Sequence, residues 1–246
     1  MSKQISIKKI KEDIREDIWI TLEARGVARW PKPVFGRIPN FEGSEETCRK
    51  IVELEIFRKA RVVKVNPDSP QALVRVYALL QGKTVIMPSP RLRHGFVVLD
   101  PSKIPREHIR EAAYIRNFMD YGEKVDPWDL PEADLVVIGS VAVNEKGARV
   151  GKGGGFADLE YGVLREFKKI SENTPVITNV HDLQVLEMDI PMERHDVPVD
   201  LIVTPTKMIK TQGVYKKPEG IYWDILQVEP EAREFIDKIK RYLRKL

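Results

Sequence analysis

A glycine-rich loop with an embedded lysine is the stretch of this sequence best suited to chemistry. It reads Gly151-Lys152-Gly153-Gly154-Gly155, and it follows a strand-like segment and precedes a helix-like one. Glycine has no side chain to block a ligand and reaches positive φ angles, so successive N–H groups can turn toward an anion. The start of the following helix adds free N–H groups and a positive dipole end. The loop alone leaves two interpretations open, a phosphate site and a flexible glycine turn with no ligand.

The spacing within this loop disfavours the two most common nucleotide-binding motifs. A Walker A loop requires a Gly-Lys-Ser/Thr ending at a six-residue spacing, which is missing here, and the dinucleotide fingerprint requires a glycine where Phe156 stands. Lys152 lies inside the loop and Asp158 follows it closely. This combination suits an anion held together with its metal ion.

Two further groups of polar residues could act with the loop. Lys11 and Arg15 lie four positions apart in an expected helix, so they neighbour each other on one face. They could hold one anion together, or form a solvated basic edge paired with glutamates of the same helix, which the helix alone favours. His181-Asp182 and the stretch 193–196 fall just beyond predicted strand ends, where open α/β sheets usually bind ligands.

The elements that must position these residues alternate between strands and helices, which predicts an α/β fold with parallel strand pairing. Apolar residues at spacings of three and four predict an amphipathic helix at 5–24. An irregular, proline- and aromatic-rich connection at 26–43 and a turn at 144–147 are also expected. Strands are predicted at 61–65, 84–87, 96–99, 135–138, 175–180 and 199–203. Further helices are predicted at 44–60 with Ser44 as N-cap, 69–80, 105–119, from the loop to about 170, and 230–246.

Composition indicates one soluble globular domain spanning 1–246, with 42% hydrophobic and 32% charged residues. The sequence contains neither a long apolar run nor a secretory leader, so we expect a cytoplasmic protein that does not span a membrane. Its net charge of +4 arises from 41 basic and 37 acidic residues mixed along the chain. This suits an anionic small molecule and makes a nucleic-acid partner a poor expectation, while the oligomeric state stays open.

The cysteine and histidine residues show no metal-binding pattern. Cys48 is the only cysteine, which excludes an internal disulfide and a cysteine-based zinc site. The four histidines lack metal-binding spacing such as H-E-x-x-H, and we interpret each as a surface or structural residue.

The glycine loop is part of a longer series of motifs. Residues 139–158 read G-S-V-A-V-N-E-K-G-A-R-V-G-K-G-G-G-F-A-D. This stretch resembles the signature of the 5-formyltetrahydrofolate cyclo-ligases, or methenyltetrahydrofolate synthetases, in which a strand precedes F-D-x-x-G-x-R-L-G and G-R-G-x-G-Y-Y-D. Lys11 and Arg15 resemble the family's N-terminal K-x-x-x-R, and residues 196–200 resemble its closing D-x-x-V-D. The resemblance covers about residues 5 to 206.

One branch of this family, the methenyltetrahydrofolate synthase domain-containing proteins, is more similar still. Its loop reads much like G-K-G-x-G-[FY]-A-D-x-E-Y, and its V-H-D-x-Q-V and V-D-x-I-x-T-P-T segments resemble residues 180–185 and 199–206. Some members carry an RNA recognition module at the C-terminus. We expect no such module here, because the aromatic pattern that it requires is missing.

The resemblance implies a fold and a reaction. The fold is a three-layer α/β structure of the NagB/RpiA/CoA-transferase type, with a mostly parallel open sheet and helices on both faces. In the reaction, ATP with Mg²⁺ phosphorylates the formyl oxygen of 5-formyltetrahydrofolate, N10 closes the ring, and phosphate leaves to give 5,10-methenyltetrahydrofolate. Catalysis of this kind consists largely of alignment and charge neutralisation.

The residues that match the family motifs receive roles by the same resemblance. Lys152 would be catalytic beside the transferred phosphoryl group, and Asp158 and Asp196 would hold Mg²⁺. The residues expected to bind ATP are Lys11, Arg15, Gly151, Lys152, Gly153, Gly154 and Gly155. The residues expected to bind the folate substrate are Lys152, Gly153, Gly154, Gly155, Phe156 and Asp68.

The folate half of the motif set departs further from the family than the ATP half. Phe156-Ala157 stand where the family has two tyrosines, and Asp68 is the only candidate for its folate-contacting glutamate. The family also has a basic Pro-Arg motif after the next strand, and the corresponding residues here, Pro88-Ser89-Pro90-Arg91, are shifted in spacing. Three functions therefore stay open: a cyclo-ligase acting on 5-formyltetrahydrofolate, which we favour, an ATP-dependent enzyme of the same mechanism with another small substrate, and a non-catalytic nucleotide- or RNA-associated binding protein.

Overall fold

Eight strands form the central sheet of the computed structural model, which describes residues 6–245. Strands β12, β10, β7, β3 and β4 pair in parallel, and β13, β5 and β6 extend the two edges in antiparallel orientation. This confirms the predicted mostly parallel sheet. From edge to edge the strands are β13 (Met208–Lys210), β12 (Leu201–Val203), β10 (Val176–Asn179), β7 (Leu135–Val137), β3 (Val62–Val65), β4 (Thr84–Pro88), β5 (Phe96–Leu99) and β6 (Glu123–Val125).

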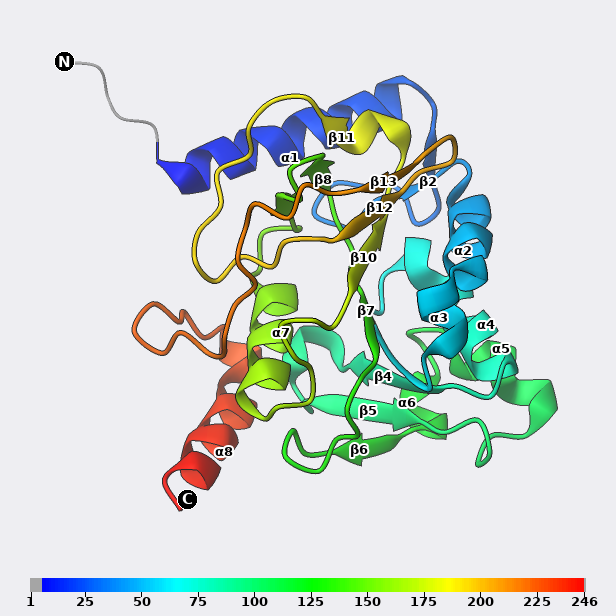
Figure 1. The fold of residues 1–246 in the computed structure, drawn as a ribbon, viewed down its shortest axis with the longest axis vertical. Helices are drawn as coiled ribbons and strands as arrows, with labels where there is room; N and C mark the ends of the chain where they lie inside the picture. Colours follow the sequence, from blue (N-terminus) through cyan, green and yellow to red (C-terminus); the bar gives the residue numbers. More distant parts are fainter. Residues whose placement is uncertain (1–5, 246) are drawn as a thin grey trace.

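Helices cover both faces of this sheet, as the three-layer prediction requires (Figure 1). On one face lie α2 (Ser44–Glu53), α3 (Glu55–Lys59), α4 (Ala72–Leu80), α5 (Ile109–Ala112) and α6 (Phe118–Tyr121). On the other face lie α7 (Phe156–Glu166) and α8 (Arg233–Leu243). Among the described residues, none of the helices has both the length and the apolar character needed to cross a membrane.

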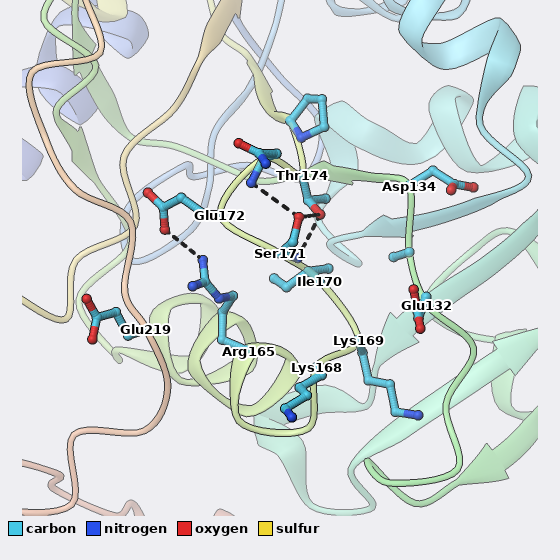
Figure 2. Close-up of a pocket in the computed structure, with 13 residues that line it drawn as sticks. Glu132, Asp134, Arg165, Lys168, Lys169, Ile170, Ser171, Glu172, Thr174 and Glu219 are labelled. Carbon is cyan, nitrogen blue, oxygen red and sulfur yellow. Dashed lines mark hydrogen bonds and ion pairs between the residues drawn. The ribbon is translucent and has the colours of Figure 1, made fainter.

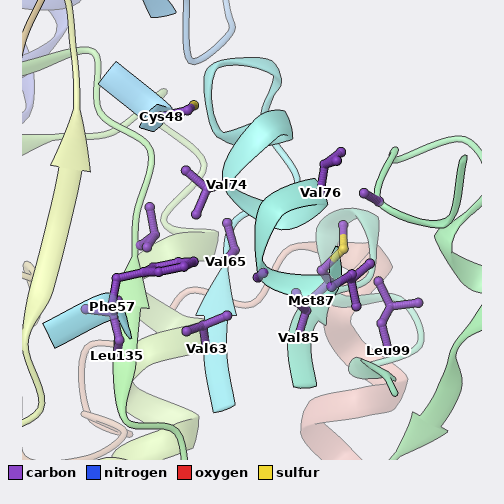
Figure 3. Close-up of a cluster of buried hydrophobic side chains, with 14 of the residues drawn as sticks. Cys48, Phe57, Val63, Val65, Val74, Val76, Val85, Met87, Leu99 and Leu135 are labelled. Carbon is purple, nitrogen blue, oxygen red and sulfur yellow. The ribbon is translucent and has the colours of Figure 1, made fainter. Parts of the chain in front are cut away.

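The alternation of side chains along β3 sends its residues to different layers. Val63 and Val65 are fully buried and pack with Phe57, Val74 and other apolar residues under the first helical layer (Figure 3). Lys64 lies between them and therefore points to the opposite face, toward α7. The interior strand thus carries one charged side chain into the layer that holds the glycine loop.

A separate unit beside these three layers positions the N-terminal helix. Helix α1 (Ile7–Ala24) buries Ile14, Ile18 and Leu22 against a small sheet, in which β8 pairs with β9 and β11. The strands are β11 (Val185–Leu186), β8 (Ala142–Asn144) and β9 (Arg149–Val150), and a separate pair joins β1 (Ala28–Arg29) to β2 (Asn40–Phe41). The predicted turn at 144–147 is confirmed, because it closes the β8–β9 hairpin with Gly147 at φ +95°.

Three predicted helices differ from the observed ones. The segment 44–60 is broken at Leu54, whose extended backbone separates α2 from α3, and Gly43 rather than Ser44 is the N-cap. The segment 105–119 contains only short helical pieces, α5, the start of α6 and a 3-10 turn. Helix α7 ends at Glu166 instead of near 170, because Lys168 adopts a left-handed conformation with φ +55°.

The remaining differences concern the ends of elements. The predicted helix 69–80 begins with a 3-10 turn, and so does the predicted helix 230–246, which is helical from Arg233 to Leu243. The first residue of the predicted helix 5–24 and the last residue of the predicted helix 230–246 lie outside the described residues. The 3-10 turns are η1 (Ser69–Gln71), η2 (Pro90–Leu92), η3 (Arg106–His108), η4 (Asp182–Gln184) and η5 (Pro230–Ala232).

Candidate functional site

The glycine loop connects β9 to α7 and is exposed from Lys152 to Gly155. Gly153 has φ +105°, and Gly155, the N-cap of α7, has φ +65°. Side chains other than glycine rarely adopt such angles, so these two positions explain part of the glycine content. Within residues 6–245, the N–H groups of Gly153, Gly154 and Gly155 donate no hydrogen bond to the protein. They are therefore free to bind an anion beside the positive end of α7.

Arg15 joins α1 to the glycine loop. Its Nε donates a hydrogen bond of 2.8 Å to the carbonyl oxygen of Gly151. A Cβ atom at Gly153 would lie 3.4 Å from the Arg15 Cζ, so the guanidinium lies directly against the loop. Burial lowers the pKa of Arg15, but an arginine retains its charge at neutral pH. Arg15 therefore lies next to the glycine loop, as predicted.

Lys11 joins the same helix to the stretch 193–196. Its Nζ lies 2.5 Å from the Asp196 carboxylate and 3.1 Å from that of Glu193, and Lys11 is only 6% exposed. The interpretation of Lys11 as part of a solvated edge paired with glutamates of its own helix is wrong. Helix α1 instead brings two basic side chains, one turn apart, to the glycine loop and to Asp196.

Arg149 is a site residue that the sequence reasoning missed. It is 2% exposed, and its Nε and Nη1 donate hydrogen bonds of 3.1 Å to the carbonyl oxygens of Val197 and Gly139. Its Nη2 pairs with Asp158, whose Oδ1 also accepts the N–H of Val197. One buried guanidinium thus ties together the end of β7, the start of α7 and the 196–200 motif. An arginine placed between Ala148 and Val150 was the available signal, because a charge in an apolar stretch requires partners.

The two carboxylates predicted to hold Mg²⁺ each retain an oxygen for a metal ion. Arg149 and an N–H group occupy Oδ1 of Asp158, while Lys11 and the N–H of Glu193 occupy Oδ2 of Asp196. The other oxygen of each carboxylate accepts no hydrogen bond from the described residues. Mg²⁺ usually takes one or two carboxylates and completes its shell with water and phosphate oxygens, so these residues fit the ion.

His195 lies in the same acidic stretch. The ligand atoms of Glu193, His195 and Asp196 lie within 4.8 Å of one another, which makes this group a second way of holding a cation at Asp196. Lys11 already supplies one positive charge there. The assignment of Asp158 and Asp196 to Mg²⁺ stays a prediction.

Asp68 follows the end of β3 and also lies next to the glycine loop. The Lys152 Nζ is 3.4 Å from its Oδ1, and a Cβ atom at Gly139 would approach its Oδ2 to 2.8 Å. Arg75, fully buried, donates to the carbonyl oxygens of Asn66 and Asp68 at 2.6 and 3.0 Å. The backbone that carries Asp68 is therefore anchored, and the predicted substrate residues Asp68 and Lys152 are brought together.

Phe156 begins α7 and folds back toward the loop. A Cβ atom at Gly154 would lie 3.0 Å from the Phe156 ring, and the same ring packs partly against the apolar layer of α7 and α8. The ring is half-buried and forms one wall beside the loop. Whether this wall contacts a pterin stays a prediction.

One surface depression lies away from the glycine loop (Figure 2). It has a volume of about 740 Å³ and is lined by residues that precede β7 and β10, such as Asp134 and Thr174. Arg165, near the C-terminal end of α7, pairs across it with Glu172. The loop precedes the N-terminal end of the same helix, whereas the depression lies beside its C-terminal end, at the amino ends of β7 and β10. Its mixture of acidic and basic side chains points to no particular ligand.

Comparison with known proteins connects this arrangement to one family. Residues 7–205 match the 5-formyltetrahydrofolate cyclo-ligase family. Methenyltetrahydrofolate synthase domain-containing proteins of Danio rerio and Homo sapiens are 44% and 43% identical to this chain over 191 residues, or 76% of it. The chain spans about half the length of these curated relatives, 50% and 49% respectively.

A solved structure agrees with the observed architecture. The NMR structure of Aquifex aeolicus 5,10-methenyltetrahydrofolate synthetase is 17% identical and superposes with a TM-score of 0.52. The superposition covers 87% of this chain and 99% of that chain, which shows a shared fold. The family match covers most of the chain, and the fold and the order of the motifs agree with it. This chain belongs to the 5-formyltetrahydrofolate cyclo-ligase family.

Proposed function

We propose that this protein binds ATP with Mg²⁺ at the glycine loop and converts 5-formyltetrahydrofolate to 5,10-methenyltetrahydrofolate. The supporting observation is that α1 places Arg15 against the loop that carries Lys152, and Lys11 against Asp196. The chain also belongs to the cyclo-ligase family. A cytoplasmic location is part of the proposal.

The basic residues would act by binding and neutralising phosphate oxygens. Arg15 lies against Gly153, so its guanidinium can donate to a phosphate held by the free N–H groups of the loop. Lys11 would add charge beside Asp196. Mg²⁺ held by Asp158 and Asp196 would neutralise further phosphate charge when bound. Electrostatic positioning of this kind is the main contribution that a protein makes to phosphoryl transfer.

Lys152 lies where the two substrates would meet. It belongs to the phosphate loop, and its Nζ is 3.4 Å from Asp68, which is expected on the folate side. In the reaction, the formyl oxygen attacks the γ-phosphorus and the bond to ADP breaks. Attack by N10 then closes the ring, and the formyl oxygen leaves with the phosphate. Lys152 would stabilise negative charge on the transferred phosphoryl group, and Asp68 would keep the lysine directed toward the folate side.

A second candidate substrate follows from Phe156 and Ala157. These residues stand where the family loop has two tyrosines, and the Phe156 ring lies against Gly154. Two hydroxyl groups and one aromatic ring are thus missing from the expected folate side. This difference supports another small formylated or carboxylated substrate, activated by the same phosphoryl transfer.

An absorbance assay tests the proposal. Purified protein is mixed with Mg-ATP and 5-formyltetrahydrofolate, and formation of the methenyl product is followed over time. If no product forms but ATP still raises the melting temperature, the cyclo-ligase proposal fails and ATP binding survives. If neither is observed, the phosphate site fails as well.

The Lys152→Ala variant tests the loop assignment. We expect loss of turnover with the fold intact, because the Lys152 side chain is 44% exposed and such surface changes usually cost about 0.5 kcal/mol or less. Lys146→Ala is a matched control, since that lysine is 45% exposed and also pairs with an aspartate, in the β8–β9 turn. Full activity of Lys152→Ala, or equal losses in both variants, would exclude a catalytic Lys152.

A further inference from the structure

Three polar side chains form a buried network between β3 and α7, the helix that follows the glycine loop. Lys64 of β3, Asn66 just after it and Glu160 of α7 are 1%, 4% and 5% exposed. The Lys64 Nζ lies 2.7 Å from the Glu160 carboxylate and donates to Asn66 Oδ1 at 2.8 Å. Asn66 Nδ2 reaches the same Glu160 oxygen at 3.3 Å. None of these residues has a role in the proposed reaction.

Stability alone does not explain such a network. Removing two charges from water is costly, and a buried ion pair is often no more stabilising than apolar residues of similar volume. The residues paired with Lys64 in the neighbouring strands, Ile86 of β4 and Val136 of β7, are apolar and buried in the layer of α7 and α8, so this face of the sheet accepts apolar side chains. A buried hydrogen-bonded pair does differ from apolar packing in one respect, since it is satisfied only in a narrow range of geometries.

The network joins the two segments that carry the proposed substrate residues. On one side, residues 64–66 lead to Asp68, and Arg75 anchors the carbonyl oxygens of Asn66 and Asp68. On the other side, Glu160 lies in the second turn of α7, which begins at the end of the glycine loop. The Nζ of Lys152 in the loop lies 3.4 Å from Oδ1 of Asp68. The two segments are thus connected by the buried bonds of the network and by this one solvent-accessible pair.

We propose that Lys64, Asn66 and Glu160 form a positioning network that sets the distance between Asp68 and Lys152. Through these residues it would align the second substrate with the transferring phosphoryl group, where displacements of about 1 Å can cost about 100-fold in rate. The roles of Asp68 and Lys152 rest on the proposed function, whereas the connection between β3 and α7 does not.

Glu160→Gln weakens the network while preserving the shape of the side chain. Backbone hydrogen exchange is measured in the loop and α7, and kcat and KM are measured with Mg-ATP and 5-formyltetrahydrofolate. We expect exchange there to become at least about tenfold faster, because local opening depends on the bonds that hold the segment. We expect kcat to fall at least about tenfold with less than about a threefold change in the KM for ATP, since alignment rather than nucleotide binding is lost.

Two further variants separate positioning from stability. Lys83→Met removes another buried lysine, which donates to the carbonyl oxygens of Arg58 and Ala60 before the amino end of β4. It should lower stability without a selective change in loop exchange or kcat. The double variant Lys64→Met with Glu160→Leu replaces the ion pair by apolar packing. It should recover part of the stability, because the ion pair is removed whole while the buried Asn66 side chain loses both of its partners. Exchange should stay fast and kcat low.

Each outcome decides the proposal. Wild-type exchange and kcat in Glu160→Gln, or the same changes in Lys83→Met, would overturn it. Wild-type behaviour of the double variant would show that packing alone is needed, and would overturn it too. If Glu160→Gln fails to fold, the double variant provides the test. If the wild-type protein makes no methenyl product, the proposed function fails, and hydrogen exchange still tests the connection between β3 and α7.

Discussion

Replacement of Arg149 by methionine is expected to destabilise the folded protein strongly. The guanidinium is 2% exposed and supplies donors to Asp158, Gly139 and Val197 at once. Breaking a buried ion pair by removing one partner typically costs about 3–5 kcal/mol. Asp158 is 13% exposed, so water can reach part of its carboxylate and the lower end applies. We therefore expect a loss of about 3 kcal/mol in the free energy of unfolding.

Urea denaturation at neutral pH measures this loss directly. For a domain of this size, 1 kcal/mol corresponds to a shift of about 2–4 °C in melting temperature, so Arg149→Met should melt about 6–12 °C lower. Arg165→Met is the control, because Arg165 pairs with Glu172, which is 56% exposed, and such pairs contribute about 0–1 kcal/mol. The reasoning is refuted if Arg149→Met loses less than about 1 kcal/mol, or no more than the control.

Three further outcomes can be measured on single residues. Burial raises the pKa of Cys48 to about 12, so the native protein at about pH 8 should resist a thiol reagent that labels the urea-unfolded chain quickly, and equal labelling rates would contradict this. Burial favours a higher pKa for Asp182, but hydrogen bonds from Thr204 and Thr206 outweigh it and lower the pKa. The resulting stability is present above about pH 4 and is lost as pH falls through the lowered folded-state pKa, so Asp182→Asn should lose less stability in acid than wild type does. A steeper acid loss in the variant would show the opposite sign. Phe156→Tyr restores one family hydroxyl and should lower the KM for 5-formyltetrahydrofolate by about tenfold, as one added hydrogen bond allows, without changing the KM for ATP. An unchanged folate KM would remove residue 156 from the substrate site.

Local sequence patterns determined the main elements and one part of the site. Apolar runs such as 135–138 predict buried strands, and the spacing of Ile14, Ile18 and Leu22 predicts one face of α1, because these patterns follow the repeat of a single strand or helix. The glycine loop was recognisable for a related reason, since its backbone conformations require glycine at particular positions. The small sheet of β8, β9 and β11 escaped prediction, because strands of two or three residues are too short to show a repeat.

Tertiary structure decided which polar side chains are buried and what they contact. Lys11 and Asp196 are 185 positions apart, and only the packing of α1 over the small sheet brings them together. The same holds for Arg149 with Val197 and for Lys64 with Glu160. A charged residue in a sequence pattern is equally compatible with a solvated surface and with a buried pair. The difference lies in the free energy of removing the charge from water, which depends on the partners supplied by distant segments.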